Sequence, residues 1–262
     1  SAMATWLALL GAGVLCGFLN AAASSGSAIS LPLLLALGLP PAVANATNRL
    51  PVLVGLVTAV WRFQIAGAIR WRLCLQLMPV FLICAVLGAN LATRLPMERI
   101  RLLVYVALAL ALVLVLLKPQ RWLNSPVDQG ATRAPSLLLQ LLMAGVGLWT
   151  GLIVLDAATY MLVSLVLVGG VALQQANAIK TVLIGVATLG SLAVFVHSGQ
   201  IAWGAALPLL LGSALGGWLG ASLALGANAR LWIYRLLITA LSIEVLMSLA
   251  GWHHPAMQRL ML

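Results

Sequence analysis

The chain has 262 residues, of which 63% are hydrophobic and only 7% are charged. Soluble globular domains carry about a quarter charged residues, so this composition excludes a soluble domain. Apolar runs of about 15 to 25 residues, with a mean hydropathy of +1.13, instead predict an all-α polytopic membrane protein. Porin-type barrels are excluded because their strands alternate apolar and polar residues.

Glycine, proline, asparagine and charged residues divide the chain into ten predicted helical segments. Five precede a polar linker at 118–135 and five follow it: 6–19, 27–39, 42–64, 72–95 and 99–117, then 136–154, 157–168, 173–197, 203–225 and 231–250. The predicted domains are therefore a first transmembrane repeat at 4–117, the linker, and a second repeat at 136–251.

The two halves resemble each other. When the chain is shifted by 132 positions, residues 45–92 match residues 177–224 at 14 of 48 places, where composition alone would give roughly five. Residue types that rarely match by chance coincide: Asn45 with Asn177, Phe63 with Phe195, Gly67 with Gly199, Trp71 with Trp203, and Gly88 with Gly220. Because each half holds an odd number of segments, we expect an inverted repeat.

The second segment of each half is too short for a comfortable crossing, which takes about 20 residues. The segment at 27–39 is also interrupted by Pro32. Both segments are predicted to be half-helices, either re-entrant or parts of broken helices, and such breaks are typical of transporter binding sites.

The net charge of +10 does not indicate a nucleic-acid partner, because the basic residues lie mostly in short loops and form no aromatic-basic face. Eight loop cations fall on the side opposite the N-terminus and four on the N-terminal side. Because cytoplasmic loops are enriched in Lys and Arg, both termini are predicted to lie outside a bacterial inner membrane.

Two further cations, Arg49 and Lys180, fall inside apolar segments, each shortly after an Asn-Ala pair. A cation inside the hydrocarbon costs about 2.5 to 3.5 kcal/mol even on the insertion scale, so each needs a partner or a function. One interpretation is snorkelling to headgroups or pairing with a buried carboxylate. The other is an anion site between the two halves, where Arg49 offers a planar fork and Lys180 a compact ammonium.

Polar residues at predicted helix starts favour the anion site. Free backbone N–H groups and the positive end of the helix dipole attract oxyanions there, and hydroxyl and amide groups add neutral donors. The candidate substrate-binding residues, besides the two cations, are Asn45, Asn177, Ser24, Ser25, Ser27, Asn48 and Thr159.

Several short motifs resemble the sulfite exporter TauE/SafE family, also called the toluene sulfonate uptake permease family. In the first half they are the Leu-Pro-Leu-Leu-Leu-Ala-Leu-Gly run at 31–38 and Ala-Asn-Ala-Thr-Asn at 44–48; in the second, Leu-Val-Leu-Val-Gly-Gly at 165–170 and Ala-Asn-Ala-Ile-Lys at 176–180. The resemblance covers nearly the whole chain. It implies a transporter, often an exporter, of sulfite or small organosulfonates such as sulfoacetate. The chain departs from the family at 20–27, where members often carry a glycine run.

A sulfonate suits fixed cations, because it stays ionised at biological pH and cannot lose its charge by protonation. Asp156 and Glu244 are the candidate proton- or ion-coupling groups, as carboxylates near the membrane interior. The alternative for Asp156 is a helix cap, and for Glu244 a hydrogen bond to a neighbouring Ser or Thr. We expect alternating access of the two halves about a central site.

Other classes of protein fit less well. No catalytic motif or nucleophile-base pair is visible, so we expect no enzyme. We also expect no cofactor and no metal site; Cys16, Cys74 and Cys84 are predicted to be inert buried thiols. The nine Trp, Trp122 among them, are predicted to be mostly interfacial anchors. A passive anion channel and an uptake permease for other small carboxylate or sulfonate anions remain alternatives.

Overall fold

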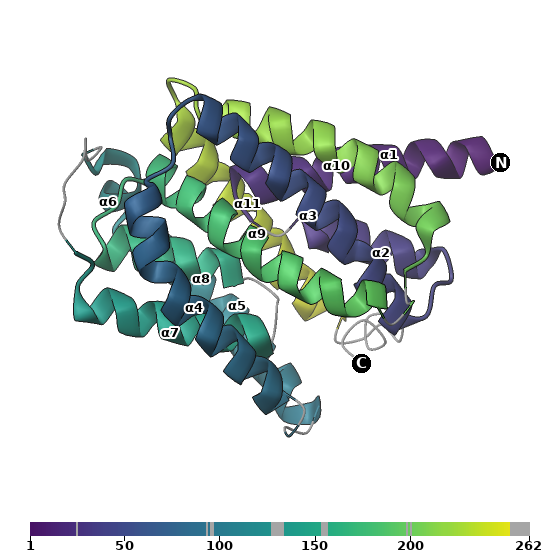
Figure 1. Ribbon diagram of the computed structural model, residues 1–262, viewed down its shortest axis with the longest axis horizontal. Coiled ribbons are helices and arrows are strands. Elements are labelled where there is room, and N and C mark those ends of the chain that lie inside the picture. Colours follow the sequence, from purple (N-terminus) through teal and green to yellow (C-terminus); the bar gives the residue numbers. More distant parts are fainter. Residues whose placement is uncertain are drawn as a thin grey trace.

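The structure, a computed structural model, describes residues 1–24, 26–92, 94, 97–126, 134–152, 157–197, 199 and 201–251. Its elements are all helical over these residues (Figure 1): α1 (Ala2–Ala22), α2 (Ser27–Ala36), α3 (Pro41–Ile65), α4 (Trp71–Ala92), α5 (Met97–Leu116), α6 (Pro119–Asn124), α7 (Leu137–Leu152), α8 (Ala157–Val163), the π-helical turn η1 (Ser164–Val168), α9 (Leu173–His197), α10 (Trp203–Leu223) and α11 (Ala229–Gly251).

Each of the ten segments expected from the sequence corresponds to a helix. Six are long and apolar enough to cross a membrane, namely α1, α3, α4, α9, α10 and α11, and four shorter apolar stretches lie in α2, α5, α7 and the continuous α8–η1. The two segments predicted to be half-helices are indeed short. Pro32, however, lies inside α2 instead of interrupting it.

The element bounds repeat along the chain with a constant spacing. Helices α3, α4 and α5 begin 132 residues before α9, α10 and α11 respectively, and α3 and α9 both have 25 residues. Four glycines have a positive φ, a conformation that costs glycine little, and they form two pairs with the same spacing: Gly38 with Gly170, and Gly67 with Gly199. The positive-φ turns of the two halves therefore recur at the same spacing as the helix starts.

The helices form two bundles that exchange one helix between the sequence halves. Helices α1, α2 and α3 pack with α10, and helices α7, α8–η1 and α9 pack with α4. Helices α3 and α9 join the two bundles and run in opposite directions side by side, while α5 packs on α11 (Figure 1). Helix α4 of the first half thus belongs to the bundle of the second half, and helix α10 of the second half to that of the first.

Glycines allow close backbone contact in both exchanged pairs. A Cβ on Gly17 would lie 2.3 Å from the carbonyl oxygen of Ser213, and a Cβ on Gly147 would lie 2.4 Å from that of Phe81. Ser213 and Phe81 are 132 residues apart, so the α1–α10 and α7–α4 interfaces have similar close contacts at similar spacing. Small residues permit such approach where no hydrophobic force drives helices together.

The linker contains a helix that the sequence analysis missed. Helix α6 is anchored by Arg121, which donates to the carbonyl oxygen of Leu167 at 2.6 Å, and by Arg230, which donates to Gln174 Oε1 at 2.7 Å and to the main chain after α6. Trp122 is completely buried and stacks on Tyr234 with ring centroids 5.8 Å apart. The prediction of an interfacial anchor is therefore wrong for Trp122, because the ring fills a gap between η1 and α11.

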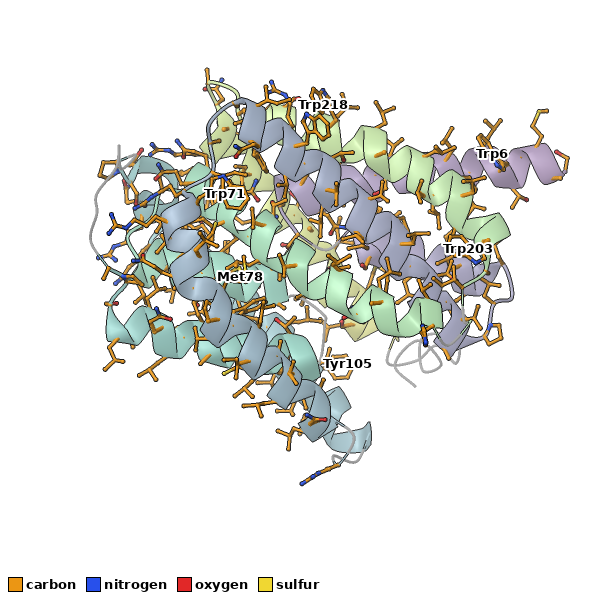
Figure 2. All side chains as sticks on the ribbon, viewed as in Figure 1. Trp6, Trp71, Met78, Tyr105, Trp203 and Trp218 are labelled. Atoms are coloured by element: carbon orange, nitrogen blue, oxygen red, sulfur yellow. The ribbon has the colours of Figure 1, made fainter. Side chains whose placement is uncertain are left out.

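Four other tryptophans are partly exposed at the surface of the helices. Trp71 lies toward one end of the molecule, Trp6 and Trp203 lie toward the other, and Trp218 lies along the upper edge between them (Figure 2); all four are more than a third exposed. Trp71 and Trp203 begin the equivalent helices α4 and α10, so equivalent points of the two halves lie at opposite ends.

Candidate functional site

Helices α1 and α2 are joined by a short connection at residues 23–26, which we call the α1–α2 break. Helix α1 ends at Ala22 and α2 begins at Ser27. A Cβ on Gly26 would lie 2.2 Å from the carbonyl oxygen of Cys16, so only glycine fits this return of the chain against α1. The Gly26 N–H donates to Asn20 Oδ1 at 2.9 Å, which fixes the turn. The break therefore has a defined shape.

Two predicted site residues on α9 reach across to this break. The Lys180 ammonium donates to the carbonyl oxygens of Asn20 at 2.8 Å and Ala23 at 2.6 Å, and Asn177 Nδ2 donates to that of Ala21 at 2.8 Å. These carbonyls end helix α1, where the helix dipole is negative. Helix α9 of the second half thus caps the C-terminus of helix α1 in the first half.

The charge of Lys180 is only partly compensated. The side chain is 1% exposed, and among the described residues its hydrogen-bond partners are main-chain carbonyls, not carboxylates. A helix C-terminus supplies about half a negative charge, which leaves net positive charge at the break. A buried ammonium in this setting favours an anion beside it.

The first turns of the two half-helices meet at the same place. Ser24 Oγ and Thr159 Oγ1 lie 2.9 Å apart and both residues are buried. Ser24 precedes α2, and Thr159 lies in the first turn of α8. No side chain caps the N-terminus of α2, whose first N–H groups and positive dipole end face the region of the break. The arrangement offers hydroxyl and N–H donors close to the ammonium.

Asn48 and Ser27 belong to a contact within the first half. Asn48 Nδ2 donates to Ser27 Oγ at 3.1 Å, and Asn48 Oδ1 accepts from Ser30 Oγ. Ser30 is buried, and its Oγ also lies 3.5 Å from Cys16 Sγ. These bonds hold α2 against α3 and α1 directly beside the break.

Arg49 and Asn45 lie elsewhere on α3. Asn45 is exposed and Arg49 is half-buried. A Cβ on Gly185 of α9 would lie 3.8 Å from Leu56 of α3, so these residues are level with each other. In an antiparallel pair with a rise of 1.5 Å per residue, Arg49 and Lys180 are then roughly 18 Å apart along the helices. The structure does not bring the two cations together.

The remaining predicted residues are Ser25, Asp156 and Glu244. Ser25 and Asp156 lie outside the described residues. Glu244, on α11, is 8% exposed. Cys16 and Cys74 are buried free thiols, as expected, whereas Cys84 is only half-buried.

Sequence analysis missed Asn20 and Ser30, which shape the break. Their only signal is position, because both are polar residues in apolar segments on either side of the small-residue turn at 21–27. Such polar residues stand out in membrane segments, but their partners depend on how the chain folds back.

Comparison with known proteins agrees with this architecture. The fold and composition define a multi-pass membrane protein, with six helices long and apolar enough to span a bilayer. The family described as sulfite exporter TauE/SafE matches residues 9–248, so the chain belongs to this family of membrane transporters, and the predicted resemblance is confirmed.

Relatives carry transporter names. The chain is 27% identical to the "Probable membrane transporter protein ORF9" of a Sinorhizobium species, over 93% of this chain and 92% of that protein. It is 28% identical to a "Probable membrane transporter protein" of Haemophilus influenzae, over 92% and 94% of the two chains. It is 24% identical to "Probable membrane transporter protein YfcA" of Escherichia coli, over 83% and 80%. No solved structure matches. The family and these names indicate a membrane transporter and not an enzyme.

Proposed function

We propose that this chain is a secondary transporter of a small sulfur-containing anion, sulfite or an organosulfonate such as sulfoacetate, and that it works as an exporter by alternating access. The observation that carries the proposal is the buried Lys180 ammonium at the α1–α2 break, beside hydroxyl groups and an uncapped helix start. The family name supplies the substrate class.

The site that we propose is centred on Lys180. Its ammonium takes one anionic oxygen, Ser24 and Thr159 turn their hydroxyl groups from each other toward the anion, and the first N–H groups of α2 complete the shell. Asn177 and Ser27 line the same break. Arg49 occupies nearly the equivalent place in the first repeat, and serves the anion at another level of its path, roughly 18 Å along the helix pair.

Alternating access would use an inverted repeat of residues 4–117 and 136–251. Three observations support it: the constant spacing of element bounds, the antiparallel α3 and α9, and the placement of Trp71 and Trp203 at opposite ends. The moving units would then be the two exchanged bundles, because the glycine contacts of α1 with α10 and α7 with α4 are too close to separate. Sliding at the α3–α9 contact would open the site to either side.

We further propose a bacterial inner-membrane location with both termini outside. Arg62, Arg121 and Arg230, in the end of α3, in α6 and at the start of α11, belong to the loop group opposite the N-terminus. The excess of cations there supports a cytoplasmic position. Asp156 and Glu244 are the proposed coupling groups for a proton or another ion.

The test uses purified protein in sealed proteoliposomes. Sulfite, sulfoacetate, sulfolactate, taurine, sulfate and matched carboxylates are compared for binding by thermal shift, and labelled anions for transport. We expect sulfur oxyanions to stabilise the protein and to accumulate against their gradient when an ion gradient is imposed. Movement only down the anion's own gradient would identify a channel instead, and preference for carboxylates would assign a different permease.

A further inference from the structure

Asn177 carries a buried oxygen, Oδ1, that has no hydrogen-bond partner among the residues that the structure describes. The residue itself is completely buried in the first turns of α9. A buried acceptor without a donor costs about 1 to 3 kcal/mol. Such a group needs an explanation, such as a ligand that is bound only in the working cycle.

The orientation of this amide is fixed by its other end. Asn177 Nδ2 donates to the carbonyl oxygen of Ala21 at 2.8 Å, and a carbonyl can only accept. Rotating the amide by 180° would place two acceptors against each other. Oδ1 is therefore an acceptor held beside the end of α1, at the break.

Lys180, one turn further along α9, has a donor hydrogen that the carbonyl oxygens at the end of α1 do not use. An ammonium has three donor hydrogens, and two of them are used by the carbonyl oxygens of Asn20 and Ala23. The break thus presents a spare charged donor and an orphaned acceptor on one helix. A metal cation would satisfy the acceptor, but the adjacent ammonium would repel it.

We propose that the break takes an anion that also carries a hydrogen-bond donor, such as a hydroxyl or ammonium group next to the sulfonate. This inference rests on the proposed function and narrows its substrate class. The sulfonate oxygens face Lys180, and the hydroxyl or N–H of the substrate donates to Asn177 Oδ1. Asn177 is then a specificity-determining residue, because a sulfonate without a donor leaves its oxygen unsatisfied.

The test compares two sulfonates of the same charge and nearly the same shape. In 2-hydroxyethanesulfonate a hydroxyl occupies the place that a methyl group has in propane-1-sulfonate. We expect the wild-type protein to bind the hydroxylated anion about tenfold to a hundredfold more tightly, as measured by titration calorimetry and by competition in proteoliposome counterflow. Both anions keep the sulfonate, so the ratio isolates the donor.

Variants of α9 assign the preference to one atom. Asn177→Leu removes the acceptor and should bring the ratio close to one, while binding of propane-1-sulfonate changes only a few-fold. Thr181→Val is the matched control, because Thr181 is equally buried on the same helix and its hydroxyl donates to the Asn177 carbonyl oxygen. This variant should keep the wild-type ratio.

Each outcome decides between the two proposals. Equal wild-type affinity for the two sulfonates would overturn the inference and leave the anion site standing, and a preserved ratio in Asn177→Leu would also overturn it. If the wild-type protein binds neither sulfonate, the proposed function fails for sulfonates as well. The wild-type ratio is decisive even where Asn177→Leu is not recovered in folded form.

Discussion

Helices α3 and α9 have the same length and different chemistry. Both have 25 residues, both follow a positive-φ glycine and a short apolar helix, and both begin an Asn-Ala pair at the fifth residue. Yet α9 sends Lys180 and Asn177 across to the other half, while Asn48 of α3 bonds to Ser27 and Ser30 of its own half. The two helices therefore have similar positions in the fold, but their polar side chains bind different partners.

The comparison shows which parts of the two halves can differ in chemistry. Backbone contacts at Gly17 and Gly147 leave no room for any other residue, so both interfaces are held in place. A polar side chain needs only a partner within reach, and the α1–α2 break offers several. We infer that the second half contributes the cation of the main site and that the first half contributes the α1–α2 break that holds this cation.

The largest effect is expected at Lys180. Lys180→Met removes the charge that binds the anion but keeps the volume of the side chain, and two α1 carbonyls lose their donor. We expect at least about a hundredfold loss of anion affinity, which corresponds to about 2.7 kcal/mol, with a smaller loss of thermal stability. Titration calorimetry and circular-dichroism melting measure the two effects.

Lys118→Met is the matched control for that prediction. Lys118 is exposed at the start of α6 and also carries a lysine charge. It should leave anion affinity unchanged. Wild-type affinity in Lys180→Met would place the anion site elsewhere and would remove the functional contrast between α9 and α3.

The two glycine interfaces should respond alike. Gly17→Ala and Gly147→Ala each place a Cβ within 2.5 Å of a backbone oxygen, and we expect each to lower stability by about 1 to 3 kcal/mol. Gly11→Ala and Gly145→Ala, on the same two helices, meet nothing within 4 Å and serve as controls. Thermal unfolding in detergent compares the pairs. A loss at only one interface would show that the equivalence of the repeats does not extend to their energetics.

A smaller effect is expected at Asn48, the position equivalent to Lys180. Asn48→Leu breaks the bonds to Ser27 and Ser30 and should lower stability by about 1 kcal/mol, with no more than a few-fold change in anion affinity. Calorimetric titration on the purified variant gives the ratio. A loss of affinity as large as that of Lys180→Met would mean that both repeats bind the anion equally.

The subtlest prediction concerns the coupling groups. If Glu244 and Asp156 take up the coupling proton, transport by Glu244→Gln and Asp156→Asn should lose its dependence on pH between about 5 and 8, while binding at a fixed pH stays close to wild type. Counterflow and gradient-driven uptake at a series of pH values separate these properties. An unchanged pH profile in both variants would assign coupling to another group.

Much of the fold could be predicted from the sequence, because membrane helices are read from local hydropathy. The ten segments, the short α2 and α8, and the equivalence of Asn45 with Asn177 all follow from composition and spacing along the chain. Helix α6 was not predicted, since six residues in a polar linker carry no periodic pattern. Trp122 was misjudged for a different reason, because its burial depends on α11 and η1, which are distant in sequence.

The sequence by itself determined that this chain is a helical membrane protein with one unusual cation in each half, because hydropathy and charge are local properties. Only the tertiary structure decided where those cations lie. It exchanges α4 and α10 between the bundles, places Lys180 on the end of α1, and sets Arg49 at another level. Such contacts depend on the direction and register in which distant helices pack, and an apolar sequence does not encode these in any single segment.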